Sequence, residues 1–315
     1  MRPIFFFLLL FPLFAASQLK WQNVDASYAP LPDGVHVYFT EQKMDTAPFR
    51  AFYLVADLNK KNLDFTVDTT FQRRLTPSQF YEKNARPVAV VNGTFFSFAT
   101  NQNLNVVIRE GRAISYNIES VKIKKGDTSE MVKVYRSAIG ISEKRKADVA
   151  WIRNDSSSTY VEASQVPASN EYNTGNKKTK KDNKTSINKN FQPWGMRTAI
   201  GGGPVLVQRG EIKISNNFER MFAGKAINDK HPRTAMGYTK NGKLIILMVK
   251  GRNPQASGAT LVQLAKIMVD LGCEEALNLD GGGSSCLLVN GKETIKPSDK
   301  TQRAVPAVFI ISSIR

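Results

Sequence analysis

The residues of this chain best suited to chemistry lie in the stretch NLDGGGSS, residues 278–285, which has an apolar run on either side. Asp280 follows the first apolar run and precedes three glycines, so we expect its carboxylate at a strand end, beside main-chain N–H groups. A turn without side chains lets a bulky ligand come close. The glycines and the hydroxyls of Ser284 and Ser285 could bind a phosphate or a sugar, while Asp280 serves as acid, base or nucleophile. The alternative is a tight hairpin whose aspartate caps its own turn.

Basic and amide side chains beside other predicted strand ends add to this set. Arg233, which precedes Thr234, offers a planar fork of donors that suits phosphate oxygens. Arg252 and Arg303 are further cations beside strand or turn boundaries, although any single one could be a surface arginine. Asn92 ends the apolar run VAVVN and could hydrogen-bond a substrate hydroxyl, and its alternative is a plain Asn-Gly turn residue.

The elements that must position these residues are mostly strands. Alternating or continuous runs of β-branched and aromatic residues, such as those at 34–42 and 63–71, are typical of strands. Helices are predicted at 76–84, which begins with Thr-Pro, and at 260–271, which begins with a capping box. Hairpin turns are predicted at the pairs Glu110-Gly111, Arg209-Gly210, Asn241-Gly242 and Asn290-Gly291. The pattern predicts an α+β fold, a single catalytic domain of strand-rich mixed sheets with few helices.

The N-terminus predicts an exported protein. Residues 1–17 contain one arginine and then a short apolar stretch that ends in small residues, which indicates a signal peptide cleaved before Gln18. An uncleaved anchor is the alternative, but the apolar stretch is short for a membrane span of ~20 residues. We therefore expect a periplasmic or extracellular protein with no transmembrane anchor after cleavage. Residues 18–49 are predicted to form an N-terminal strand segment ahead of the main domain at 50–315.

The charge of the chain limits its partners. A formal net charge of +17 favours polyanionic surroundings such as phosphorylated glycans, acidic cell-wall polymers or nucleic acid. Residues 170–190 hold six lysines and almost no apolar residues, which predicts a solvated, mobile insertion. No nucleic-acid-binding module accompanies the charge, and aromatic residues are not interleaved with the basic run, so nucleic acid is not an expected partner.

The few cysteines and histidines limit metal and redox chemistry. Cys273 and Cys286 could pair or could remain buried thiols. With only His36 and His231 present, a histidine-rich zinc site is nearly excluded. Acidic residues at calcium-loop spacing are also missing. No cofactor is therefore identified, and dependence on a divalent metal is left open.

Several of the segments described above resemble, in order and spacing, the phosphodiester glycosidase family. The most specific piece is AKIMVDLGCEEALNLDGGGSS. The matching segments are VVNGTFF (90–96), GGGPVLVQRGE (201–211), HPRTAMG (231–237), the segment from Gly258 to Gly291, and QRAVPAVFII (302–311). The resemblance implies that 50–315 is a phosphodiester glycosidase-like domain. It also implies a hydrolase that cuts the bond between a sugar's anomeric carbon and a phosphate oxygen, so the expected substrate of this exported protein is a phosphate-linked sugar or an anionic glycan.

The resemblance also implies a role for each candidate residue. Asp280 would supply the carboxylate beside the oxocarbenium-like sugar. Arg233, helped by Arg252 or Arg303, would hold the negative charge of the leaving phosphate. Asp280 and Arg233 should then converge on one cavity floored by glycine. The residues expected to position or admit the substrate are Asn92, Thr234, Ser284 and the glycines Gly202, Gly203, Gly281 and Gly282.

Two positions depart from the family pattern. Lys250 stands where an acidic residue often precedes Gly-Arg, and Thr94 stands where a smaller or acidic residue is frequent. Either departure implies an altered choice of substrate or the loss of a second carboxylate, for which Glu110 and Asp229 are the guesses. The alternative function, from a different class, is a non-catalytic binding module for anionic glycans.

Overall fold

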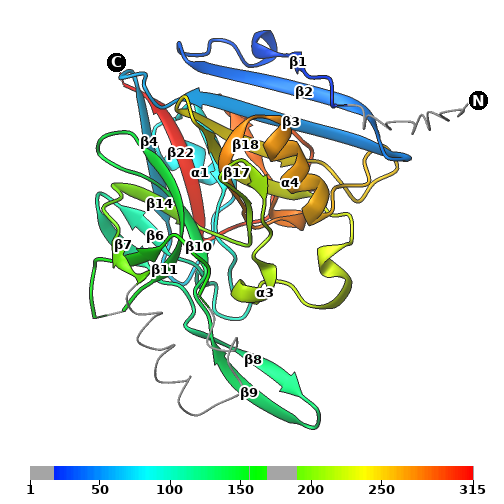
Figure 1. Cartoon of the computed structure of the whole chain (residues 1–315). Helices are drawn as coiled ribbons and strands as arrows, with labels where there is room; N and C mark the ends of the chain where they lie inside the picture. Colours follow the sequence, from blue (N-terminus) through cyan, green and yellow to red (C-terminus); the bar gives the residue numbers. More distant parts are fainter. Residues whose placement is uncertain (1–17, 156, 169–189, 315) are drawn as a thin grey trace, which may run out of the picture.

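The computed structural model describes residues 18–155, 157–168 and 190–314, in which strands dominate (Figure 1). The predicted signal peptide at 1–17 and residues 170–189 of the predicted lysine-rich insertion lie outside the described residues. The strands form three larger sheets and a separate hairpin. The α-helices of the described residues are α1 (Pro77–Lys83), α3 (Asn216–Glu219) and α4 (Leu261–Asp270). The predicted α+β, strand-rich fold with few helices is confirmed.

All strand pairs within the described residues are antiparallel. The eight-stranded sheet has the order β1 (Gln22–Asn23), β2 (Val35–Met44), β3 (Ala47–Asp57), β18 (Lys243–Val249), β17 (Arg233–Thr239), β19 (Cys273–Asn278), β15 (Val205–Gln208) and β16 (Glu211–Ile212). The seven-stranded sheet has the order β13 (Gln192–Pro193), β12 (Glu162–Ser164), β11 (Ala147–Arg153), β10 (Ser137–Ile141), β14 (Thr198–Gly201), β6 (Val107–Arg109) and β7 (Arg112–Ser115). The five-stranded sheet has the order β21 (Lys292–Glu293), β20 (Leu287–Val289), β5 (Ala89–Asn92), β22 (Ala307–Ser313) and β4 (Leu63–Thr69).

Smaller elements complete the described chain. The strands β8 (Ser120–Lys125) and β9 (Thr128–Lys133) form the separate hairpin, which projects away from the rest of the molecule in Figure 1. Single 3₁₀ turns are η1 (Asp25–Tyr28), η2 (Gly224–Ile227) and η3 (Gly282–Ser284). None of the described helices is long and apolar enough to cross a membrane.

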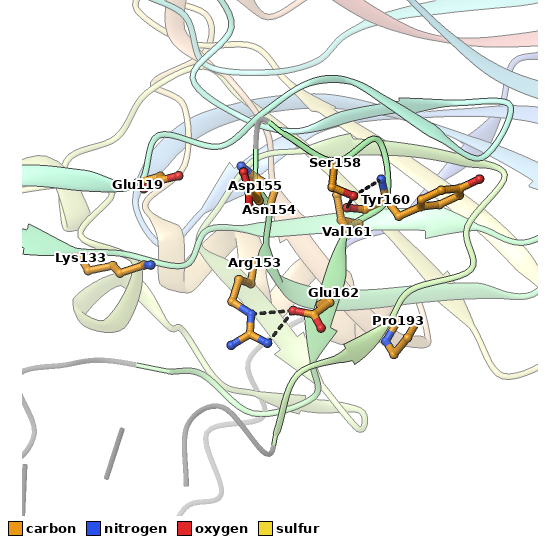
Figure 2. A pocket seen from close by; sticks show the side chains of 10 residues that line it. All are labelled: Glu119, Lys133, Arg153, Asn154, Asp155, Ser158, Tyr160, Val161, Glu162 and Pro193. Carbon is orange, nitrogen blue, oxygen red and sulfur yellow. Dashed lines mark hydrogen bonds and ion pairs between the residues drawn. The ribbon is translucent and has the colours of Figure 1, made fainter. Parts of the chain in front are cut away.

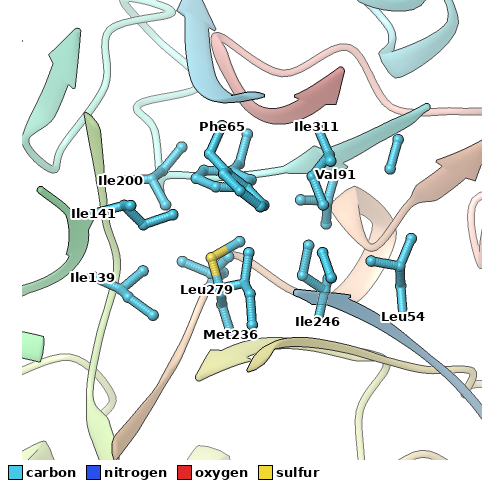
Figure 3. Close-up of a cluster of buried hydrophobic side chains, with 14 of the residues drawn as sticks. Leu54, Phe65, Val91, Ile139, Ile141, Ile200, Met236, Ile246, Leu279 and Ile311 are labelled. Carbon is cyan, nitrogen blue, oxygen red and sulfur yellow. The ribbon is translucent and has the colours of Figure 1, made fainter. Parts of the chain in front are cut away.

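The continuous apolar run of β18 shows how the central sheet is buried. Leu244, Ile246 and Met248 belong to the core cluster that the three larger sheets share. Figure 3 shows Ile246 in this cluster. The alternate residues of β18 point to the other face, which α4 covers with Leu264 and Met268. Successive side chains of a strand point to opposite faces, so both faces of β18 are buried and its sequence cannot alternate with polar residues.

Local signals placed the helices and turns correctly. In α1 and in α4 the predicted entry is confirmed as a capping box, Thr76 with Gln79 and Thr260 with Gln263. All four predicted Xaa-Gly pairs connect neighbouring strands. At the first, second and fourth pair both residues have positive φ, which the tight hairpin turn with right-handed strand twist requires.

The predicted N-terminal strand segment is part of the central sheet. Its strand β2 pairs along its whole length with β3, from Val35 opposite Ala56 to Met44 opposite Ala47. The predicted boundary at residue 50 therefore falls inside β3. Residues 18–49 contribute the edge of the same sheet that carries β17 and β19, the two strands next to the candidate site.

Candidate active site

Asp280 lies where two sheets meet. It follows β19 of the eight-stranded sheet, and its N–H donates a 3.0 Å hydrogen bond to the carbonyl of Gly93, which follows β5 of the five-stranded sheet. The side-chain amide of Asn92 donates a 2.6 Å bond to the carbonyl of Asp280. The predicted position of this carboxyl just beyond a strand is confirmed, and a strand distant in the sequence holds it there.

Asn92 and Thr234 form a buried network beneath the Asp280 loop. Both are fully buried, with no exposed surface. The Thr234 hydroxyl donates a 2.9 Å bond to the side-chain oxygen of Asn92, which also accepts a 3.0 Å bond from the N–H of Cys286. The sequence predicted that these two side chains contact the substrate. The structure instead turns both toward the protein interior, because β5 and β17 bring them between the two sheets, so they position the loop.

The glycine loop closes on itself as a 3₁₀ turn. The N–H of Gly282 donates a 2.8 Å bond to the carbonyl of Pro232, and the N–H of Ser284 donates a 3.1 Å bond to the carbonyl of Gly281. The N–H of Gly281 donates a 2.9 Å bond to the carboxyl of Asp280. The sequence predicted that the main-chain N–H groups of this loop are free to bind an anion. This prediction is wrong for Gly281, Gly282 and Ser284, because each of their N–H groups donates to an acceptor of the protein.

The glycines are needed because side chains of the protein crowd against the loop. A Cβ on Gly281 would lie 2.9 Å from the carbonyl oxygen of Pro232. A Cβ on Gly283 would lie 2.0 Å from Oδ2 of Asp299 and 2.2 Å from Nη2 of Arg303. The glycines were predicted to let a ligand come close to the backbone. At Gly283 the groups that come close are the side chains of Asp299 and Arg303 of the protein itself.

Burial tunes the carboxyl of Asp280. It raises the pKa of Asp280 to about 6, although hydrogen bonds from Ser284 and from the N–H of Gly281 and the charge of Arg303 lower it. The residue keeps some exposed surface. A carboxyl that exchanges its proton close to neutral pH can serve as general acid, general base or nucleophile.

Arg303 is the cation whose charge acts on Asp280. Its Nη1 lies 3.4 Å from the hydroxyl of Ser284, and its Nη2 pairs with the carboxylate of Asp299. The guanidinium also lies over the ring of Phe98, 5.4 Å from the centroid, and Phe98 is 65% exposed. Neither Asp299 nor Phe98 could be selected from the sequence, because their positions near the loop depend on the path of other segments of the chain.

Arg252 approaches the same loop at its middle glycine. A Cβ on Gly282 would lie 3.2 Å from Nη2 of Arg252, whose side chain is exposed and whose φ is +60°. The same Nη2 lies 3.5 Å from Nδ1 of His231. Burial and the charges of Arg233 and Arg252 lower the pKa of His231, so its imidazole is neutral at physiological pH. His231 lies in the segment HPR beside Arg233, so its place near the site could have been inferred from the sequence. It was considered there only as a metal ligand.

Arg233 takes a different place from the predicted one. It is buried, with 3% of its surface exposed, and its guanidinium donates bonds of 3.1 to 3.2 Å to the carbonyls of Ala259, Ala226 and Asp229. It also lies over the ring of Phe222. The prediction that its guanidinium opens into the cavity beside Asp280 is corrected, because these carbonyls turn it inward. Burial and the charge of Arg252 lower the pKa of Arg233 to about 10.

The other glycine triplet serves packing. The N–H of Gly202 bonds to the carbonyl of Ser137 at 3.0 Å, and that of Gly203 bonds to the carbonyl of Asn278 at 2.7 Å. A Cβ on Gly202 would lie 2.5 Å from the same carbonyl of Asn278. Both glycines are buried. The prediction that they admit substrate is therefore corrected, since protein backbone fills the space beside them.

A buried carboxyl beside this triplet joins three elements. Glu219 of α3 is fully buried and accepts bonds from the N–H groups of Ser137 and Val205 and from Nε1 of Trp151. Burial raises the pKa of Glu219. Its oxygens bind only protein donors in these contacts, so it fixes the junction of the seven- and eight-stranded sheets.

The two guessed second acids lie in different places. Glu110 is exposed in the β6–β7 turn, where its charge acts on Arg197. Asp229 is exposed next to the site, where its charge acts on Arg233 and His231. Asp299, which the sequence analysis did not consider, lies closer still to the glycine loop.

The described residues contain neither an accessible thiol nor a cluster of metal-binding side chains. Cys273 and Cys286 are free and buried, and burial raises the pKa of Cys273 to about 12 and that of Cys286 as well. Within the described ranges no three side chains of the types His, Cys, Asp and Glu gather in a way that could hold a metal ion.

A pocket of about 700 Å³ lies near the projecting hairpin, away from the predicted residues (Figure 2). Its charged lining is partly neutralised, because Arg153 donates a 2.7 Å bond to the carboxylate of Glu162. Tyr160 stands beside it and is 72% exposed. None of the residues predicted for the site line this pocket, so the Asp280 loop remains the candidate active site.

Comparison with known proteins decides the family. The model of the phosphodiester glycosidase family matches residues 85–312, which is most of the chain and includes the Asp280 loop, Arg252 and Arg303. The chain belongs to this family. The resemblance inferred from the sequence segments is therefore confirmed.

Two other proteins match part of the sequence of this phosphodiester glycosidase family member. The SPbeta prophage-derived uncharacterized protein YomE of Bacillus subtilis is 42% identical over 118 residues, which are 38% of this chain and 18% of that protein. The N-acetylglucosamine-1-phosphodiester α-N-acetylglucosaminidase of Bos taurus is 37% identical over 92 residues, which are 29% of this chain and 16% of that protein. The matched stretches thus cover less than a fifth of either relative.

A solved structure supports the family fold over almost the whole chain. The zebrafish N-acetylglucosamine-1-phosphodiester α-N-acetylglucosaminidase catalytic domain superimposes with a TM-score of 0.60 at 19% identity. The match covers 95% of this chain and 89% of the zebrafish domain. At this identity the similarity establishes the phosphodiester glycosidase fold.

Proposed function

We propose that this protein is an exported phosphodiester glycosidase that hydrolyses the bond between the anomeric carbon of a sugar and a phosphate oxygen in a glycan or cell-wall polymer. Family membership supports the class of reaction, and the predicted signal peptide supports export. The observation that carries the proposal is the carboxyl of Asp280, whose pKa is raised to about 6 in a glycine loop flanked by Arg252 and Arg303.

The site offers a group for each charge that the reaction develops. When the bond between the anomeric carbon and the phosphate oxygen breaks, the electron pair stays on the oxygen and positive charge develops on the sugar. The carboxylate of Asp280 stabilises that positive charge, either by attacking the anomeric carbon or by taking the proton of the attacking water. In both routes the oxygen of one water molecule ends on the anomeric carbon.

The arginines act on the leaving group. A phosphate monoester leaves easily when its charge is held, so strong protonation matters less than a fixed cation. Arg252 suits this role because it is exposed and its guanidinium lies beside the middle glycine of the loop. Arg303 lies between the loop and Phe98, so it holds the other end of the site, where the exposed ring offers a flat apolar face to a sugar.

The test uses the full chain and a panel of sugar-1-phosphodiesters, beginning with methyl-phospho-N-acetylglucosamine, the sugar named for the cattle relative. Release of free sugar and of a phosphate monoester would be followed together, with and without a chelator. We expect turnover by the wild-type protein and a loss of about 10²- to 10⁴-fold in Asp280→Asn.

Two control measurements separate the enzyme from a binding module. Gly195→Ala alters an exposed glycine with open space around it and ordinary φ, so it should retain wild-type turnover. A wild-type protein that binds these compounds and releases no sugar from any of them would contradict the enzyme and identify a module for anionic glycans.

A further inference from the structure

A second cavity adjoins the glycine loop through Arg252. It has a volume of about 350 Å³ and lies between the segments 250–255 and 296–298. Arg252, whose Nη2 would lie 3.2 Å from a Cβ on Gly282, also lines this cavity. The cavity and the candidate active site therefore have Arg252 in common.

The charge of this cavity is of one sign. Lys250 and Lys296 line it together with Arg252, and its lining includes no acidic residue. In the described part of the chain no carboxylate lies within ion-pair distance of these three cations. Three cations around a concave surface attract an anion and repel one another when the surface is empty.

Of the cavity cations, Lys296 acts on Lys250. Burial and the charges of Arg50 and Lys296 lower the pKa of Lys250, and Glu41 opposes them. The carboxylate of Glu41 pairs with Arg50 at 2.5 Å, so it offsets the charge of Arg50 and only part of that of Lys250. An anionic ligand would relieve a cost that the protein alone does not offset.

The backbone of the loop that carries Lys250 and Arg252 packs against the protein. Gly251 packs against Pro232, where a Cβ would lie 2.8 Å from its nitrogen, and Gly258 packs against His231. The main-chain groups of Asn253 and Ala256 bond to each other at 3.1 and 3.2 Å. These contacts tie the loop to His231 and Pro232, the residues just before β17.

We propose that this cavity binds a second phosphate group, on the leaving-group side of the substrate. Lys250 and Lys296 hold that phosphate while Arg252 holds the phosphate at the bond that breaks. The substrate class is then a sugar-1-phosphodiester whose other substituent carries a further phosphate, as in a polymer with repeated phosphodiester links. This inference rests on the proposed function for the order of the two phosphates, whereas the anion site itself stands on the cavity.

The kinetic test compares two synthetic substrates that differ by one phosphate. They are N-acetylglucosamine-1-phosphoglycerol and the same compound with a second phosphate on the glycerol. We expect the wild-type protein to prefer the second compound by about 10-fold or more in kcat/KM at low ionic strength, and high salt should reduce the preference. In the Lys250→Ala/Lys296→Ala double variant the preference should fall to about 2-fold or less.

A matched variant controls for the loss of two charges. Lys61 and Lys144 are exposed lysines outside the cavity lining, so Lys61→Ala/Lys144→Ala should keep the wild-type preference. An equal fall in both double variants, or no preference in the wild-type protein that turns over both compounds, would overturn the second phosphate site.

A binding measurement separates this inference from the proposed function. Inorganic tripolyphosphate, titrated calorimetrically into the full chain, should bind about 10-fold more weakly to the lysine double variant than to wild type and to the matched control. If no sugar phosphate is turned over but this difference is found, the anion site holds and the glycosidase proposal fails. Equal affinity of all three proteins would refute the anion site whatever the activity.

Discussion

The side-chain amide of Asn92 donates a 2.6 Å hydrogen bond to the main-chain carbonyl of Asp280, so the end of β5 fixes the loop that carries the candidate catalytic carboxyl. Neither polar atom of the Asn92 amide is exposed, and its oxygen accepts two further bonds. The five-stranded sheet therefore holds the loop that follows β19 of the eight-stranded sheet.

Removal of this amide should lower both stability and turnover. In Asn92→Ala a buried carbonyl, an N–H and a hydroxyl lose their partner, which should lower the free energy of unfolding by about 1–3 kcal/mol. The loop should then hold Asp280 less well, so kcat should fall while KM changes little. Urea unfolding and steady-state kinetics check both effects.

Thr234 provides the matched pair for the same network. Thr234→Ser keeps the hydroxyl that donates to Asn92 at 2.9 Å, and Thr234→Val replaces it with a methyl of similar size. We expect Thr234→Val to reduce kcat more than Thr234→Ser does, when both variants are measured under conditions in which they are fully folded. A larger effect of Thr234→Ser on kcat would show that the methyl, and not the hydroxyl, positions the loop.

Asp280 should oppose stability at neutral pH. Its pKa in the folded protein is about 6, above the ordinary 3.8, so the neutral form stabilises the fold below pH 4 and this contribution is lost as the pH rises through 6. The Asp280→Asn variant cannot ionise there, so it should be more stable than wild type at pH 8 by up to about 3 kcal/mol. At pH 4 the two proteins should differ little. Urea unfolding at both pH values gives the comparison, and a variant that is less stable than wild type at pH 8 would refute it.

Arg303 should set the acidic limb of the pH profile. Its charge lowers the pKa of Asp280, so Arg303→Gln should raise that pKa and move the acidic limb of kcat/KM to higher pH. The partner carboxylate of Asp299 would then stand unpaired near the loop and add to the shift. Arg303→Lys keeps the charge and should keep the limb close to its wild-type position. Coincident limbs in all three proteins would mean that another group than Asp280 controls activity.

Gly283 should be intolerant of a methyl group. The Cβ of Gly283→Ala would lie 2.0 Å from Asp299 and 2.2 Å from Arg303, so both side chains must move. Their ends are flexible, so kcat/KM should fall by about 10-fold or more while the free energy of unfolding changes by about 1 kcal/mol or less. Gly195→Ala should change neither quantity, and an equal response of the two variants would contradict the crowded loop.

The two thiols should be unreactive in the folded protein. Cys273 and Cys286 are buried and free, and burial raises the pKa of each, so the reactive thiolate is scarce and shielded. Ellman's reagent should detect two thiols in urea and almost none in native buffer. Detection of no thiol in urea without reductant would show a disulfide in place of the free pair.

The secondary structure could be predicted well because its signals are local. The capping boxes at Thr76 and Thr260 and the hairpin at Asn290-Gly291 each depend on atoms a few residues apart. The place of Asp280 beyond a strand could also be predicted, because an apolar run before glycines signals a strand that ends there. The family segments around Asp280 carried the assignment to the phosphodiester glycosidase family.

The roles of single side chains could not be predicted in the same way. Arg233 and Arg303 are equivalent in type, yet carbonyls from 226–259 turn the first inward, while Arg303 reaches Ser284. The sequence predicted Asn92 as a turn residue or a substrate ligand. In the structure two sheets meet over Asn92, so its buried side chain connects the Asp280 loop with Thr234. The contacts of Asn92 join residues more than a hundred positions apart, and those of the two arginines depend on how separate loops fold together, so no short pattern encodes them.

The sequence by itself thus determined the strands, the helices, the turns and the carboxyl at position 280. Only the tertiary structure decided which arginine faces that carboxyl, how far its pKa rises and where the uncompensated lysines gather. The physical reason is range: dihedral preferences and caps act within one turn of chain, whereas burial and electrostatic interactions depend on everything that the fold brings near.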